Sequence, residues 1–285
     1  MSQVKQHYNF DLIDAASFGY SAVWAERHYL LKLALVPLMI KFASMVIIMT
    51  QGFEADILKQ GLILIPATLT EGWLLAQFLR TLIKQERWPI ILEQEPDEKT
   101  LTYLLTRARG IVACCLVYVL LMLVTYFFKY GYDYLTEANI LPNAETAGDT
   151  PPNPAFMLFG IVGLVFGIWS FRFFWIYIPF SVLVGAKDYL KYMGGFASSL
   201  KLMGLFLISM VPTLVLAMLV SGVVATPFAG DEELNKIGQF LMLFIGSAAE
   251  ILIALIVTAS LTWSMRDLLP RAAGALPDIK KSDEM

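Results

Sequence analysis

Charged residues are scarce in this sequence. Lys, Arg, Asp and Glu make up 16% of its 285 residues, whereas a soluble domain carries about a quarter. Hydrophobic residues make up 58%, and two long stretches, 110–128 and 202–230, contain no charge at all. About twenty helical residues are enough to cross a bilayer. The composition therefore predicts an all-α, polytopic membrane protein.

Histidine and cysteine are also nearly absent, which limits the chemistry available to the chain. The only histidines are His7 and His28, and the only cysteines, Cys114 and Cys115, are neighbours within an apolar stretch. Adjacent cysteines rarely form a disulfide, and two histidines near one end of the chain do not form a histidine-rich metal or haem site. We therefore expect no metal site, no cofactor and no disulfide.

Catalytic and nucleic-acid-binding motifs are missing as well. The chain has no HExxH, GxSxG or P-loop sequence, and such motifs supply the ligands and nucleophiles of common enzymes. The net charge is −3 without a polybasic block, so nothing indicates a nucleic-acid partner. We expect a protein that is not an enzyme and whose main partner is the lipid bilayer.

Hydropathy predicts six membrane spans, and the distribution of basic residues predicts their orientation. With the N-terminus in the cytoplasm, cytoplasmic segments hold sixteen Lys and Arg residues and the opposite side holds three. The positive-inside rule therefore places both termini in the cytoplasm. The spans are expected at about 30–51, 57–80, 109–128, 155–180, 202–226 and 238–264.

A threefold repeat accounts for three arginines at the ends of apolar stretches. The even-numbered spans end in QFLR, WSFR and WSMR, which place Arg80, Arg172 and Arg266 at intervals of 92 and 94 residues. We interpret all three as interfacial anchors whose long side chains reach the headgroups; a ligand-binding role for Arg172 is the alternative. The aromatic run FFWIYIPF that follows Arg172 is expected to lie along the interface.

A candidate amphipathic helix precedes each odd-numbered span. In the first, Ile13, Ala16, Tyr20, Val23 and Trp24 share one helical face. Similar helices are expected before spans three and five. The chain is thus predicted to be a single integral membrane domain, residues 1–285, built as three helical hairpins with cytoplasmic interfacial helices. Its approximate repeat units are 10–83, 97–184 and 187–268, followed by a cytoplasmic tail at 269–285.

The stretch IPFSVLVGAKDYLKYMGGFASSLKLMGLF, Ile178–Phe206, carries a resemblance to known proteins. A proline closes span four, a short interfacial helix follows, and Ser-Ser-Leu-Lys leads directly into span five. This layout resembles the YciC-like group of six-span bacterial membrane proteins and the membrane domain of some glycerophosphodiester phosphodiesterases. The resemblance implies a bacterial inner-membrane location and a link to lipid or envelope physiology. It implies no functional residues.

Three ionisable residues lie deep in the predicted spans: Lys41, Glu71 and Glu250. At 1.5 Å per residue, Lys41 and Glu71 differ in depth by roughly 6 Å across the first hairpin, a gap that a lysine side chain covers. We therefore expect them to meet, either as a pair that fixes helix register or as part of a hydrophilic pathway. Glu250 has three interpretations: a proton-titrating group, an acid hydrogen-bonded between helices, or a second carboxylate that shares Lys41.

Two functions remain open from the sequence. The first is a membrane scaffold or accessory subunit that packs against other membrane proteins or against copies of itself. The alternative is a transporter or channel for a small solute or a lipid, with Lys41, Glu71 and Glu250 in its polar interior. A transporter predicts that the three side chains converge on a cavity. A scaffold predicts a dry core and an open apolar or Gly/Ala-lined face.

Overall fold

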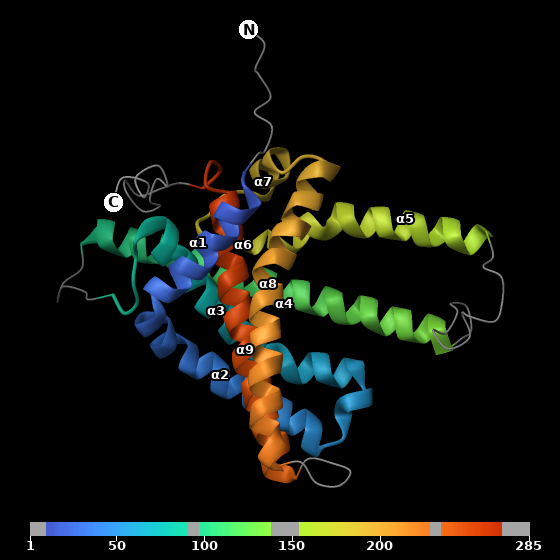
Figure 1. The fold of residues 1–285 in the computed structure, drawn as a ribbon. Helices are drawn as coiled ribbons and strands as arrows, with labels where there is room; N and C mark the ends of the chain where they lie inside the picture. Colours follow the sequence, from blue (N-terminus) through green and yellow to red (C-terminus); the bar gives the residue numbers. More distant parts are fainter. Residues whose placement is uncertain (1–9, 91–96, 138–153, 229–234, 270–285) are drawn as a thin grey trace.

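The computed structural model describes residues 10–90, 97–137, 154–228 and 235–269. This part of the chain is helical and contains no strand (Figure 1). Six segments are long and apolar enough to cross a membrane, which supports the predicted multi-pass membrane protein. Five of them are single helices: α2 (Arg27–Thr50), α3 (Ile57–Lys84), α4 (Glu98–Glu137), α8 (Phe196–Ala225) and α9 (Lys236–Ser264). The remaining segment continues from α5 (Pro154–Ser170) through the 3₁₀ turn η2 (Phe171–Trp175) into α6 (Tyr177–Ser181).

Acidic and amide side chains begin several of these helices. Asp56 accepts a hydrogen bond from the Lys59 backbone N–H at 3.1 Å, and Asn235 accepts one from the Gly238 backbone N–H at 2.8 Å. Asp97 caps α4 by accepting a hydrogen bond from the Thr100 backbone N–H at 2.8 Å. Hydrogen bonds from the side chain and the backbone of Thr100 lower the pKa of the Asp97 carboxyl. Each cap satisfies a backbone donor that the first helical turn leaves free.

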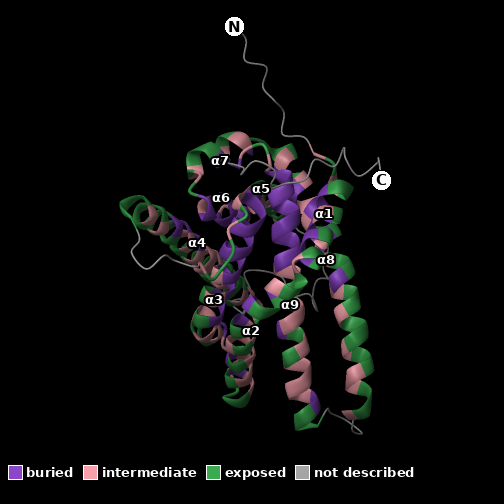
Figure 2. Cartoon of the chain, turned by 90° about the vertical axis from the view of Figure 1, so that its left-hand side faces the viewer, coloured by how far each residue is buried: buried purple, intermediate pink, exposed green. Residues whose placement is uncertain are grey.

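Helix α3 is the centre of the structure. It packs against α2 and α4 and also contacts α9 and α6. Its second half, from Leu74 to Ile83, is buried throughout. In Figure 2 the buried residues gather around this half of α3 and the second half of α9, near α1 and α6, whereas the far end of α8 is mostly exposed and that of α9 mostly of intermediate burial.

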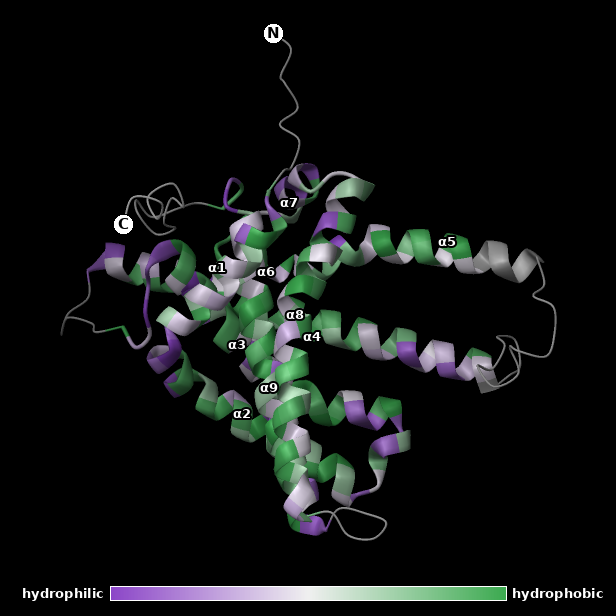
Figure 3. Cartoon of the chain, viewed as in Figure 1, coloured by the Kyte–Doolittle hydropathy of each residue, from purple (hydrophilic) through white to green (hydrophobic). Residues whose placement is uncertain are grey.

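The long helices consist largely of hydrophobic residues (Figure 3), and many of these are exposed. Leu116, Leu219 and Val223 have exposed fractions of 60%, 64% and 75%. Soluble monomers rarely expose contiguous apolar surface on this scale. The pattern fits helices that face lipid.

Helix α1 (Leu12–Ala25) packs closely on α9 and also contacts α8. A Cβ atom added to Gly19 would clash with Ser260 Oγ and lie 2.7 Å from the Ile256 carbonyl oxygen, so this position requires glycine. The buried face therefore consists of small residues, Ala15, Ala16, Gly19, Ala22 and Val23. Of the predicted apolar face, Ala16 and Val23 lie in this contact, whereas Ile13 and Trp24 are exposed.

The other two predicted amphipathic helices also differ from expectation. The second is not a separate element, because α4 continues without a break from Glu98 to Glu137. The third is divided: α7 (Ala186–Tyr192) ends before Gly194 and Gly195, and α8 starts at Phe196. Gly195, at φ 153°, allows the change of direction between them.

The helices adjacent in sequence do not all pack in the same way. α2 packs against α3, and α8 packs against α9. α4 instead packs mainly on α3 and α6, while α5 contacts α8. Figure 1 shows α4 and α5 extending away from the centre of the molecule on the same side.

Candidate functional site

The three deep ionisable residues come together although they lie on three different helices. Lys41 on α2 donates a hydrogen bond through Nζ to Glu71 Oε2 on α3 at 2.9 Å. The same Nζ lies 2.7 Å from Glu250 Oε2 on α9. The side chains of Lys41 and Glu71 are 12% and 8% exposed, whereas that of Glu250 is 59% exposed. One ammonium group therefore bridges a buried carboxylate and an accessible one.

Tyr118 on α4 completes the surroundings of Glu71. Its hydroxyl donates a hydrogen bond to Glu71 Oε1 at 2.7 Å, so both carboxylate oxygens of Glu71 have partners. Helix α4 comes this close because Gly72 has no side chain: a Cβ atom there would lie 3.1 Å from the Cα of Cys115. The site thus depends on α2, α3, α4 and α9.

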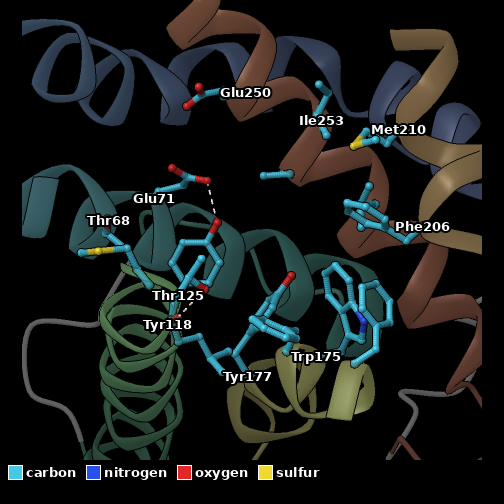
Figure 4. Close-up of a pocket in the computed structure, with 16 residues that line it drawn as sticks. Thr68, Glu71, Tyr118, Thr125, Trp175, Tyr177, Phe206, Met210, Glu250 and Ile253 are labelled. Atoms are coloured by element: carbon cyan, nitrogen blue, oxygen red, sulfur yellow. Dashed lines mark hydrogen bonds between the residues drawn. The ribbon is translucent and has the colours of Figure 1, made fainter. Parts of the chain in front are cut away.

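A cavity of about 540 Å³ opens beside this cluster (Figure 4). The carboxyl groups of Glu71 and Glu250 lie at one end, and Trp175 and Phe206 lie at the other. Aromatic residues form much of the wall: Tyr118, Phe171, Phe174, Trp175, Tyr177 and Phe206. This volume is within the usual range for small-molecule sites.

A second cavity, of about 310 Å³, borders the cluster as well. It extends along α3 toward the turn between α2 and α3, where Glu54 and Gln60 line it. Four residues line both cavities: Thr68, Glu71, Met122 and Glu250. The two cavities therefore adjoin at the ion-pair cluster: the smaller one follows α3 toward its start, and the larger one is bounded mainly by α4, η2, α8 and α9.

The electrostatic balance of the cluster is negative. One lysine contacts two carboxylates, which leaves one formal negative charge when all three groups are ionised. Among the residues that line the larger cavity, two are acidic and none is basic. Uncompensated charge at membrane depth is costly and commonly marks a functional site.

Comparison of the chain with protein-family models, curated proteins and solved structures gives no match. The resemblance of Ile178–Phe206 to the YciC-like group therefore stays a prediction.

The aromatic wall was not expected from the sequence. Residues 173–180 were predicted to lie along the membrane interface, but Trp175, Tyr177 and Ile178 are buried. The chain turns inward because α5 ends at Ser170 and continues as a 3₁₀ turn and a short helix. The Tyr177 hydroxyl hydrogen-bonds to the Thr258 hydroxyl at 2.7 Å, which links α6 to α9 behind the cavity.

The three arginines predicted as anchors have different surroundings. Arg80 is 1% exposed, donates to Glu86 Oε2 at 2.8 Å through Nε and donates to the Ser181 carbonyl at 2.9 Å through Nη1. Arg172 is 8% exposed and its guanidinium lies over the Trp169 ring at 4.4 Å. Arg266 lies over Trp263 at the same distance.

These arginine contacts lie outside the two cavities. The described residues also contain no group of three or more His, Cys, Asp or Glu side chains that could hold a metal ion. Among the described ionisable residues singled out from the sequence, Lys41, Glu71 and Glu250 are thus the ones that line these cavities.

Proposed function

We propose that this chain is a multi-pass membrane transporter for a small solute, with Lys41, Glu71 and Glu250 in the transport path. The observation that carries the proposal is the position of this cluster between two adjoining cavities. A pair that only fixes helix register needs one acid and one base in a sealed core. Here a second acid is present, its side chain is 59% exposed, and it lines both cavities.

In this proposal the Lys41 ammonium acts as the gate between the cavities. It connects α3 through Glu71 and α9 through Glu250, so loss of either contact would separate α2 from one of these neighbours. Transporters open and close a central site by moving one group of helices against another. A solute that competes for a carboxylate would release the lysine and favour this motion.

We further propose the membrane arrangement that the basic residues predict: three hairpins, both termini in the cytoplasm and a location in the bacterial inner membrane. In this orientation the smaller cavity, with Glu54 and Gln60, opens toward the outside. The larger cavity, with Phe171 and Phe206, lies toward the cytoplasmic half. The matching Trp–Arg stacking of WSFR and WSMR supports the repeat behind this arrangement.

Cysteine accessibility tests the proposal. In a background with Cys114 and Cys115 replaced by alanine, we would introduce single cysteines at Met210 in the larger cavity and Gln60 in the smaller one. Leu120→Cys is the control, because Leu120 is 58% exposed on the outer face of α4 and lines neither cavity.

A small, charged, membrane-impermeant thiol reagent is then added to either side of sealed vesicles. We expect Gln60→Cys to react from one side and Met210→Cys from the other, each much faster than Leu120→Cys. If neither cavity position reacts faster than the control from either side, the cavities are closed to water and the transport proposal is wrong.

A scaffold or accessory subunit is the second candidate, and one observation on α5 favours it. A Cβ atom added at Gly160, Gly163 or Gly167 would meet no atom of the described residues within 4 Å. Membrane helices pack closely on such glycines, so this face of α5 is open to another helix. In the cysteine-free background, oxidation of Gly163→Cys yields a disulfide-linked dimer if a second copy packs there. A monomer without co-purifying protein removes the candidate.

A further inference from the structure

We infer that the larger cavity binds organic cations: molecules with a positively charged ammonium or phosphonium centre attached to an apolar body. The inference rests on the proposed function, because it names the class of solute for the same site. It is carried by two features of the cavity: its charge and the arrangement of its aromatic rings.

The charge selects against anions. Glu71 and Glu250 are the two ionisable acids in the lining, and the one base in contact with them, Lys41, neutralises a single negative charge. An entering cation would restore neutrality at membrane depth, whereas an anion would add a second uncompensated charge. Glu250 is the accessible partner, because its side chain is 59% exposed while that of Glu71 is 8% exposed.

The aromatic rings provide the second contact. Phe171, Trp175 and Phe206 form a mutual cluster with centroid distances of 5.5–5.6 Å. Tyr177 connects this cluster to Tyr118, whose ring centroid is 5.2 Å away from its own. Aromatic faces attract cations and also bury apolar surface. A wall that combines rings with a net negative charge is the chemistry by which proteins recognise organic ammonium groups.

The cavity also divides into two ends. Figure 4 shows the carboxyl groups at one end and Trp175 with Phe206 at the other, so a bound molecule can place its charged centre and its apolar body separately.

A purely apolar occupant, such as a lipid acyl chain, is the main competing explanation. It would account for the rings but not for two carboxylates in the same wall. The two explanations differ in one respect that can be measured: an apolar site accepts a hydrophobic ion of either sign.

The test uses two ions of matching shape and opposite charge, tetraphenylphosphonium and tetraphenylborate. We would measure equilibrium binding of each labelled ion to the full chain in lipid nanodiscs and count only the label that excess unlabelled ion displaces. We expect saturable binding of tetraphenylphosphonium and no saturable binding of tetraphenylborate. Saturable binding of both ions with similar affinity would overturn the inference in favour of an apolar site.

Variants assign the binding to this cavity. Glu250→Gln should weaken tetraphenylphosphonium binding at least about tenfold, because it removes the accessible carboxylate. Phe206→Leu should weaken it about fivefold while keeping the apolar volume, because it removes a ring face. Glu54→Gln is the matched control: it neutralises a carboxylate that lines only the smaller cavity, and binding should not change. Unchanged affinity in both Glu250→Gln and Phe206→Leu would overturn the inference.

These outcomes separate the cation inference from the transport proposal. Cation binding together with cysteines that stay inaccessible from both sides would keep the cation site and remove transport. Accessible cysteines together with no preference for the cation would keep a wet path and remove the solute class.

Discussion

Replacing Lys41 with methionine tests whether the cluster is an electrostatic unit. Methionine keeps much of the length of the side chain but removes the ammonium that contacts Glu71 at 2.9 Å and Glu250 at 2.7 Å. Removing one partner of a buried ion pair costs about 3–5 kcal/mol, because the remaining charge is left without compensation. The carboxylate that is left buried is that of Glu71, which is 8% exposed.

The two contacts should contribute unequally. Two charges about 4 Å apart, counted from the ammonium to the middle of the carboxylate, are worth about 4 kcal/mol at an effective dielectric constant near 20, which suits the mostly buried contact with Glu71. Contact with a side chain as exposed as Glu250 is worth only about 0–1 kcal/mol. The hydrogen bond from Tyr118 to Glu71 is present with or without Lys41, so it does not change the difference. We therefore expect Lys41→Met to lower the free energy of unfolding by about 4 kcal/mol.

The assay is equilibrium unfolding of the purified protein in mixed micelles, followed by tryptophan fluorescence as the fraction of denaturing detergent rises. A double-mutant cycle separates the two contacts. Lys41→Met and Glu71→Gln should couple by about 3–4 kcal/mol, because the cycle isolates the contact between the two buried charges. Lys41→Met and Glu250→Gln should couple by less than about 1 kcal/mol.

Lys59→Met is the control for the loss of a lysine, since Lys59 forms an exposed ion pair with Asp56 in the first turn of α3. It should leave the unfolding transition unchanged. Equal coupling of Lys41 to both carboxylates, or no coupling to either, would refute the assignment of Glu71 as the buried partner.

Three further predictions concern the rest of the structure. Gly19→Ala should destabilise the protein by about 1–3 kcal/mol in the same unfolding assay, because the added methyl group overpacks the contact between α1 and α9; Gly163→Ala, which faces open space, should have no destabilising effect. Arg80→Met should cost about 2–4 kcal/mol, since it removes the buried donor to the Ser181 carbonyl and leaves Glu86 with only its 3.6 Å contact to Arg107, and a loss below about 1 kcal/mol would contradict this role. The Asp97 cap, whose pKa is lowered in the folded state, stabilises the protein above the unfolded pKa of about 4 and less as pH falls through the folded value. The difference in melting temperature between the native chain and Asp97→Asn should therefore shrink on acidification.

The contact between Lys41 and Glu71 could be predicted from the sequence because both residues belong to helices joined by a short turn. α2 ends at Thr50 and α3 starts at Ile57, so counting residues from the turn gives the depth of each side chain at a rise of about 1.5 Å per residue. Glu250 could not be placed in the same way. It lies on α9, far along the chain, and no short turn relates its depth or its facing side to Lys41.

The aromatic wall was missed for a different reason. Composition describes FFWIYIPF equally well as a lipid-facing, an interfacial or a buried segment. Its position depends on the helix break after Ser170 and on the hydrogen bond between Tyr177 and Thr258. The face of α1 shows the same limit, because hydrophobicity favours Ile13 and Trp24 whereas close packing on α9 selects alanine and glycine.

The second carboxylate decides between a structural and a functional interpretation of the cluster. A structural ion pair is complete with Lys41 and Glu71, and adding Glu250 leaves a net negative charge at membrane depth without adding a buried contact. The presence of Glu250 is therefore expected to leave the free energy of unfolding unchanged or to lower it. Its position is useful if the ammonium must have an alternative partner while a cation occupies the cavity, or if Glu250 itself receives that cation. If so, Glu250→Gln should leave unfolding nearly unchanged while it weakens cation binding, which neither a register pair nor an apolar pocket predicts.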